Sequence, residues 1–114
     1  MYTAYFGVLN DKRKLKWDNG ETNPYDVLRD PIELERKGFD LVVKGNTYFS
    51  KKIQIDWGSF AWRCTEKQIV KYLKDHKTQL PWLLGKDEEM IEEVLRYVER
   101  EKGEAYGIVC IENY

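Results

Sequence analysis

Few residues of this chain could carry out covalent chemistry. It contains two cysteines, Cys64 and Cys110, and one histidine, His76. A thiol beside an imidazole is a common nucleophile in enzymes. If residues 65–76 form one helix, Cys64 lies about 17 Å from His76 along the helix axis, too far for a hydrogen bond. An enzyme with a pocket near Cys110, His76 and a tyrosine is therefore the remaining catalytic alternative, and its substrate class is unassigned.

A run of acidic residues begins at Asp87, and it is the nearest approach to a metal site. Glu89 and Glu93 are one helical turn apart and share a face. There is no calcium-loop pattern, zinc spacing or companion histidine, and acids are favoured near a helix N-terminus. P-loop, GxSxG and HExxH motifs are also absent from the sequence. The sequence thus predicts a solvated helix face, no metal, no cofactor and no assigned catalytic residue, so a non-enzymatic role is favoured.

A short basic segment is the best candidate for nucleic-acid binding. It comprises Lys12, Arg13, Lys14, Lys16 and Trp17. Basic side chains beside an aromatic ring could bind a phosphate and stack on a base. The segment has an acidic residue on either side, and the whole chain has a formal net charge of -1. Nucleic-acid binding through this segment is kept as an alternative to a solvated loop or a lysine-protected edge strand.

Aromatic residues are unusually abundant in this chain. The four Trp, eight Tyr and four Phe make up 14% of the sequence, more rings than a small core needs, and exposed rings often mark a binding surface. Trp62 alternates with apolar neighbours and is predicted in the core. Trp57, beside Gly58, and Trp82, in a connector, are predicted to be exposed. With Arg63 they are the predicted hot spots of a protein interface, or of a homo-oligomer contact. A stacking platform for sugars or bases is the alternative use of the exposed rings.

Two helices carry the clearest local signals. Residues 65–76 are predicted as a helix because Thr65 and Gln68 have the spacing of a capping box. Apolar residues then recur at helical intervals from Ile69. A second helix is predicted over residues 87–101, with Asp87 as its cap.

Strands are expected on both sides of these helices. Apolar runs at residues 2–9 and 105–111 predict strands buried on both faces. Residues 39–56 predict a hairpin that turns at Gly45-Asn46. Residues 60–64 alternate between the two faces of a strand and predict that the strand continues there.

Proline placement predicts short helical turns near residues 24–37, since Pro24 and Pro31 each follow a helix-capping residue. The expected fold class is therefore α+β. It comprises a mixed or antiparallel sheet of about four to five strands, with both terminal strands central and two main helices on one face. The chain's 114 residues predict one globular domain over residues 1–114.

Composition narrows the class of protein. No apolar run is long enough for a membrane span, and the first residues lack the pattern of a signal peptide. Two cysteines without a framework spacing predict reduced thiols and a cytoplasmic location. The sequence predicts a small non-enzymatic protein-binding module of inhibitor, immunity or mobile-element type, which docks on another protein through exposed aromatic residues. Nucleic-acid binding and an uncharacterised enzyme remain the alternatives.

Overall fold

The protein is described by a computed structural model that covers residues 1–10, 26–56, 58–77 and 80–112. These residues form a five-stranded sheet, three α-helices and a short 3-10 helix. The strands are β1 (Tyr2–Leu9), β2 (Leu28–Leu34), β3 (Ile53–Asp56), β4 (Ser59–Cys64) and β5 (Tyr106–Glu112). The helices are α1 (Gly38–Tyr48), α2 (Glu66–Asp75), α3 (Leu84–Arg100) and the 3-10 helix η2 (Pro81–Leu83).

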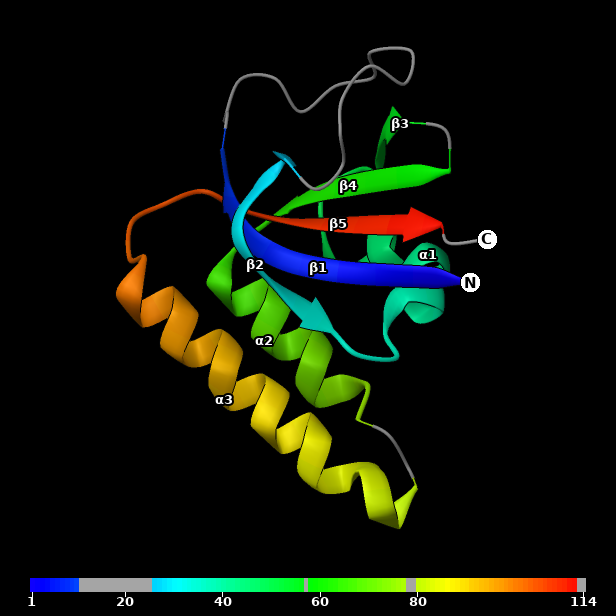
Figure 1. Ribbon diagram of the computed structural model, residues 1–114, viewed down its shortest axis with the longest axis vertical. Coiled ribbons are helices and arrows are strands. Elements are labelled where there is room, and N and C mark those ends of the chain that lie inside the picture. The colour runs from blue at the N-terminus through cyan, green and yellow to red at the C-terminus, as the bar shows by residue number, and fades with distance from the viewer. Residues whose placement is uncertain (11–25, 57, 78–79, 113–114) are drawn as a thin grey trace.

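The sheet has the order β2-β1-β5-β4-β3, and every neighbouring pair is antiparallel (Figure 1). The predicted α+β fold is confirmed, and so is the central position of both terminal strands. β1 and β5 pair along their length, from Tyr2 opposite Glu112 to Val8 opposite Tyr106. The sheet is therefore completed by contacts between the two ends of the chain.

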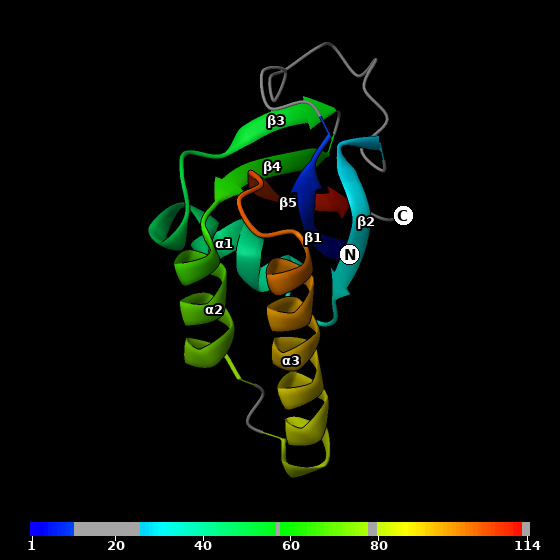
Figure 2. The same cartoon turned by 90° about the vertical axis from the view of Figure 1, so that its left-hand side faces the viewer.

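The three α-helices lie on one side of the sheet (Figure 2). Alternate residues of the strands pack against them, including Phe6, Trp62 and Ile108, which are fully buried as core residues. The prediction that Trp62 lies in the core is confirmed. A smaller cluster that includes Ala61 and Val109 is buried on the other face. The central strand β5 is thus buried on both faces, as its continuous apolar sequence predicts.

The hairpin predicted over residues 39–56 is wrong in its first half, because residues 38–48 form α1. Leu41 and Gly45 face the sheet and are buried. A Cβ at Gly45 would lie 2.5 Å from the Trp62 ring, so the missing side chain lets the helix approach the sheet closely. Asn46 does not form a turn. Its Oδ1 accepts a hydrogen bond from Trp62 Nε1 at 2.9 Å.

The short helical turns predicted near residues 24–37 are also wrong over residues 28–34, where β2 runs along the edge of the sheet. The register of β1 and β2 shifts opposite Pro31, and Asp30 has a positive φ of 46°. Proline lacks a donor N–H, so it is tolerated at such an edge bulge. The Tyr97 hydroxyl bridges β1 and β2 at this bulge. It donates a hydrogen bond to the carbonyl of Arg29 and accepts one from Val8 N at 2.9 Å.

The helices α2 and α3 follow the predictions closely. The capping box of α2 is present, with Gln68 N donating to Thr65 Oγ1 at 3.2 Å and Thr65 N donating to Gln68 Oε1 at 2.9 Å. The helix α3 begins at Leu84, earlier than the predicted cap at Asp87. Asp87 is instead buried inside the first turn. No helix within the described ranges is long and apolar enough to cross a membrane.

Candidate functional site

The two cysteines occupy the core. Cys110 is fully buried, and its thiol donates a hydrogen bond to the carbonyl of Gly38 at 3.3 Å. Burial raises the pKa of Cys110 to about 12, and it also raises the pKa of the buried Cys64. A thiol that stays protonated at neutral pH is a poor nucleophile. The Cys110 thiol is therefore not activated as the enzyme alternative would require.

His76 lies at the end of α2, in a cluster of aromatic and acidic side chains. Its Nε2 atom is 2.9 Å from the hydroxyl of Tyr48, and its Nδ1 atom is 4.0 Å from a carboxylate oxygen of Asp40. Asp40 also accepts a hydrogen bond of 2.5 Å from the hydroxyl of Tyr72. The His76 ring contacts both tyrosine rings, at centroid distances of 5.2 and 5.0 Å. These contacts join the end of α2 to α1.

The pKa shifts in this cluster oppose a role as nucleophile or base. Burial and the hydrogen bond to Asp75 raise the pKa of Tyr48. Burial and the hydrogen bond to Asp40 also raise the pKa of Tyr72 above its ordinary value. Burial alone would raise the pKa of Asp40, but hydrogen bonds from Tyr72 and Lys44 outweigh it and lower the pKa. The phenols stay protonated and the carboxylate stays charged, which suits a fixed hydrogen-bonded contact between helices.

Two of the predicted docking residues, Arg63 and Trp82, are described by the structure, and they lie in different parts of the molecule. Arg63 lies between Trp62 and Cys64, which face the helices, so its half-buried side chain belongs to the opposite face of the sheet. Trp82 lies in η2, directly before α3, and is 74% exposed. The helix α3 begins at its end farthest from the sheet (Figures 1 and 2). The exposure predicted for Trp82 is thus observed, but Arg63 and Trp82 do not form one patch. Trp57 and the basic segment of residues 12–17 lie outside the described residues.

Other exposed apolar side chains were missed by sequence reasoning. Phe39 and Val43 are one turn apart on α1 and are 71% and 63% exposed. Leu80, two residues before Trp82, is also exposed. The spacing of Phe39 and Val43 was the available signal, but it is hidden if residues 39–44 are interpreted as a strand.

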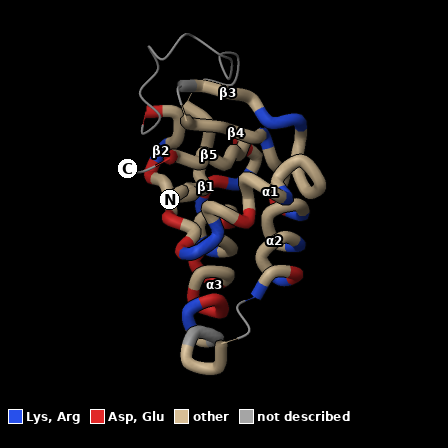
Figure 3. The backbone as a smooth tube through the Cα atoms, turned by 90° about the vertical axis from the view of Figure 1, so that its right-hand side faces the viewer, with Lys and Arg blue, Asp and Glu red and all other residues tan. Residues whose placement is uncertain are grey.

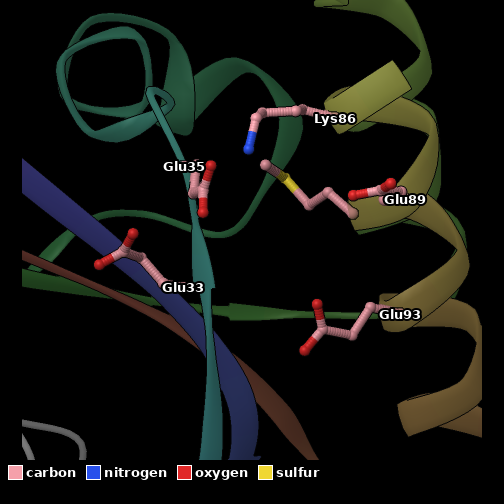
Figure 4. A pocket seen from close by; sticks show the side chains of 6 residues that line it. Glu33, Glu35, Lys86, Glu89 and Glu93 are labelled. Carbon is pink, nitrogen blue, oxygen red and sulfur yellow. The ribbon is translucent and has the colours of Figure 1, made fainter. Parts of the chain in front are cut away.

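Two adjoining hollows lie beside the end of β2. The larger has a volume of about 540 Å³ and a mainly apolar lining, which includes Met1, Tyr2 and Phe39. The smaller has a volume of about 80 Å³ and lies between β2 and α3 (Figure 4). It is lined by Glu33, Glu35, Lys86, Glu89, Met90 and Glu93. Both hollows are lined by Glu33 and Glu35, so they adjoin at the end of β2, and we refer to the two hollows together as the β2 groove.

Charge is distributed unevenly around the molecule. Lysines gather along α2 and in the segment before β3, whereas acidic residues gather along β2 and α3 (Figure 3). No group of His, Cys, Asp and Glu that could bind a metal ion is found in the described part of the chain.

Comparisons of the chain with protein-family models, curated proteins and solved structures found no match. The strongest features of the chain's own geometry are the exposed apolar residues of α1 and η2 and the β2 groove.

Proposed function

We propose that this chain is a small, cytoplasmic, non-enzymatic protein-binding module of inhibitor, immunity or mobile-element type. The observation that carries the proposal is the exposure of large apolar side chains, above all Trp82 at 74% and Phe39 at 71%. Such side chains lose contact with water when a partner covers them, and tryptophan is among the residues that contribute most to interface energy.

The state of the titratable groups supports a binding role. The thiols of Cys64 and Cys110 are buried and protonated, and the His76 cluster joins α1 to α2. Two free cysteines also fit a reducing compartment such as the cytoplasm. The groups best suited to covalent chemistry are thus held in structural contacts, while the most exposed apolar groups are available to a partner.

The test is affinity capture from the native host's lysate, using the full chain with a C-terminal tag because Met1 lines the β2 groove. The substitution Trp82→Ala is expected to weaken capture of a specific protein by roughly 30-fold, the loss typical of an interface hot spot. Leu95→Ala is the control, because Leu95 is a partly exposed apolar residue that lies on α3 and not in η2. The control should retain the partner.

Nuclease treatment separates the alternatives. A protein partner that survives nuclease and is lost with Trp82→Ala or Phe39→Ala supports docking. Material that disappears with nuclease would favour nucleic-acid binding through Lys12 to Trp17. If both alanine variants retain every partner, docking through these residues is contradicted. A concentration-dependent sedimentation coefficient that Trp82→Ala abolishes would identify the partner as a second copy of the chain.

A further inference from the structure

The β2 groove combines an apolar hollow with an acidic one. The larger hollow is of the size that admits a bulky side chain, and exposed Met1 and Phe39 line it. Four carboxylates and one ammonium group line the smaller hollow, which gives its lining a formal charge of three negative units, while Arg36 lines the adjoining hollow. In Figure 4, Lys86 and Glu93 extend from α3 toward β2, whereas Glu33 turns to the other side of the strand. Carboxylates therefore flank both sides of the edge strand.

The acids of α3 that lie outside the β2 groove have basic partners, but those inside it do not. The four paired acids are Asp87 with Lys37, Glu88 with Lys77, Glu92 with Arg96 and Glu99 with Lys102. Among the described residues, no ion pair or hydrogen bond involves the side chains of Glu89 or Glu93, and the same holds for Glu33 and Glu35 across the groove. The groove is thus a place where negative charge is left for an external cation.

β2 is an edge strand of the sheet that the described residues form. It pairs with β1 on one side, and no strand within the described ranges pairs with its other side. The bulge at Pro31 interrupts the first half of this edge, but Glu33 and Leu34, in its second half, line the groove. An extended segment laid along such an edge can form main-chain hydrogen bonds, and its alternate side chains then point to the two faces.

We propose that the β2 groove binds an extended segment of a partner protein in which a lysine or arginine adjoins a large apolar side chain. This inference rests on the proposed docking function and specifies the chemistry of the partner. The cationic side chain enters the acidic hollow beside Glu89 and Glu93, and the apolar side chain enters the hollow lined by Met1 and Phe39.

The test begins with selection of random phage-displayed peptides on the full chain. Enriched sequences should place Lys or Arg next to a large apolar residue. The affinity of the most enriched peptide, synthesised with a fluorophore, is then measured by fluorescence anisotropy. Replacing two groove acids, Glu89→Gln with Glu93→Gln, should weaken binding roughly tenfold, and added salt should weaken it further.

The double variant Glu92→Gln with Glu99→Gln is the matched control, because it removes the same charge from the same helix outside the groove. It should change the affinity by less than about twofold. Equal losses in both double variants, acidic or neutral enriched peptides, or no enrichment would overturn the inference. If Trp82→Ala abolishes capture of a lysate protein while the groove variant leaves it unchanged, the docking function stands and only the inference about the groove fails.

Discussion

Lys37 and Asp87 form an ion pair that is almost completely withdrawn from water. The Nζ atom lies 3.2 Å from Asp87 Oδ1, and the two side chains are only 5% and 7% exposed. Lys37 also donates a hydrogen bond to the carbonyl of His76. One ammonium group therefore connects the start of α1, the end of α2 and the first turn of α3. Such a contact matters because a buried charge without its partner is strongly unfavourable.

Removal of this ammonium should destabilise the fold more than removal of an exposed charge. Lys37→Met is expected to lower the free energy of unfolding by about 3–5 kcal/mol, because the Asp87 carboxylate loses its charged partner. Arg96→Met breaks an exposed contact of 3.9 Å with Glu92 and should cost less than about 1 kcal/mol. Urea denaturation measures both values. Similar small losses in the two variants would show that the buried pair contributes little.

At the scale of elements, α1 depends on a helical glycine that faces the sheet. Gly45→Ala should destabilise the protein by about 1–3 kcal/mol, because the added methyl group collides with the Trp62 ring. Gly85 is the control, since it is also helical but an added Cβ meets nothing within 4 Å. Gly85→Ala should stabilise by up to about 1 kcal/mol. Thermal unfolding of the two variants would contradict this packing argument if their melting temperatures moved in the same direction.

The same glycine explains why α1 could not be predicted from local sequence. Residues 39–44 contain two adjacent valines, and Gly45-Asn46 has the composition of a hairpin turn. The deciding contacts are with Trp62, which is distant in sequence. By contrast, α2 was predictable because its capping box and apolar stripe lie within the helix itself.

The candidate site was predictable only in part, for a related reason. The exposure of Trp82 follows from its place in a connector between two helices. The β2 groove needs Glu33 on a strand and Glu89 on a distant helix, and that strand was expected to be helical. The acidic residues of α3 were identified from the sequence, but the sequence does not distinguish Glu89 and Glu93 from the acids that form ion pairs with basic residues.

The whole molecule buries several groups whose protons are lost at alkaline pH. Burial raises the pKa of Cys110 to about 12 from an ordinary value of 9.0. Burial likewise raises the pKa of Cys64 above 9.0, and those of Tyr72 and Tyr97 above 10.0. The unfolded chain therefore releases these protons at a lower pH than the folded chain does.

The free energy of unfolding should accordingly be fully maintained below about pH 9 and should fall as the pH rises toward about 12, the pKa of folded Cys110. The sign follows because raised pKa values in the folded state leave it binding more protons than the unfolded state. Chemical denaturation across this range measures the slope. Cys110→Ala should lower stability at every pH but reduce the slope between about pH 9 and 10. An unchanged slope in that variant would exclude Cys110 as a contributor.

The pairing of β1 with β5 also has a consequence for the newly made chain. β1 leaves the ribosome first among the strands, yet its long central neighbour is β5, which is synthesised last. Until then the described strands can form the β1–β2 and β3–β4 pairs but not the pairs with β5, so the apolar edges of β1 and β4 are uncovered. Such long-range pairing is slow, and unpaired edges favour aggregation. The sheet is thus expected to be completed only once β5 has been synthesised, and a chain truncated before β5 is expected to aggregate.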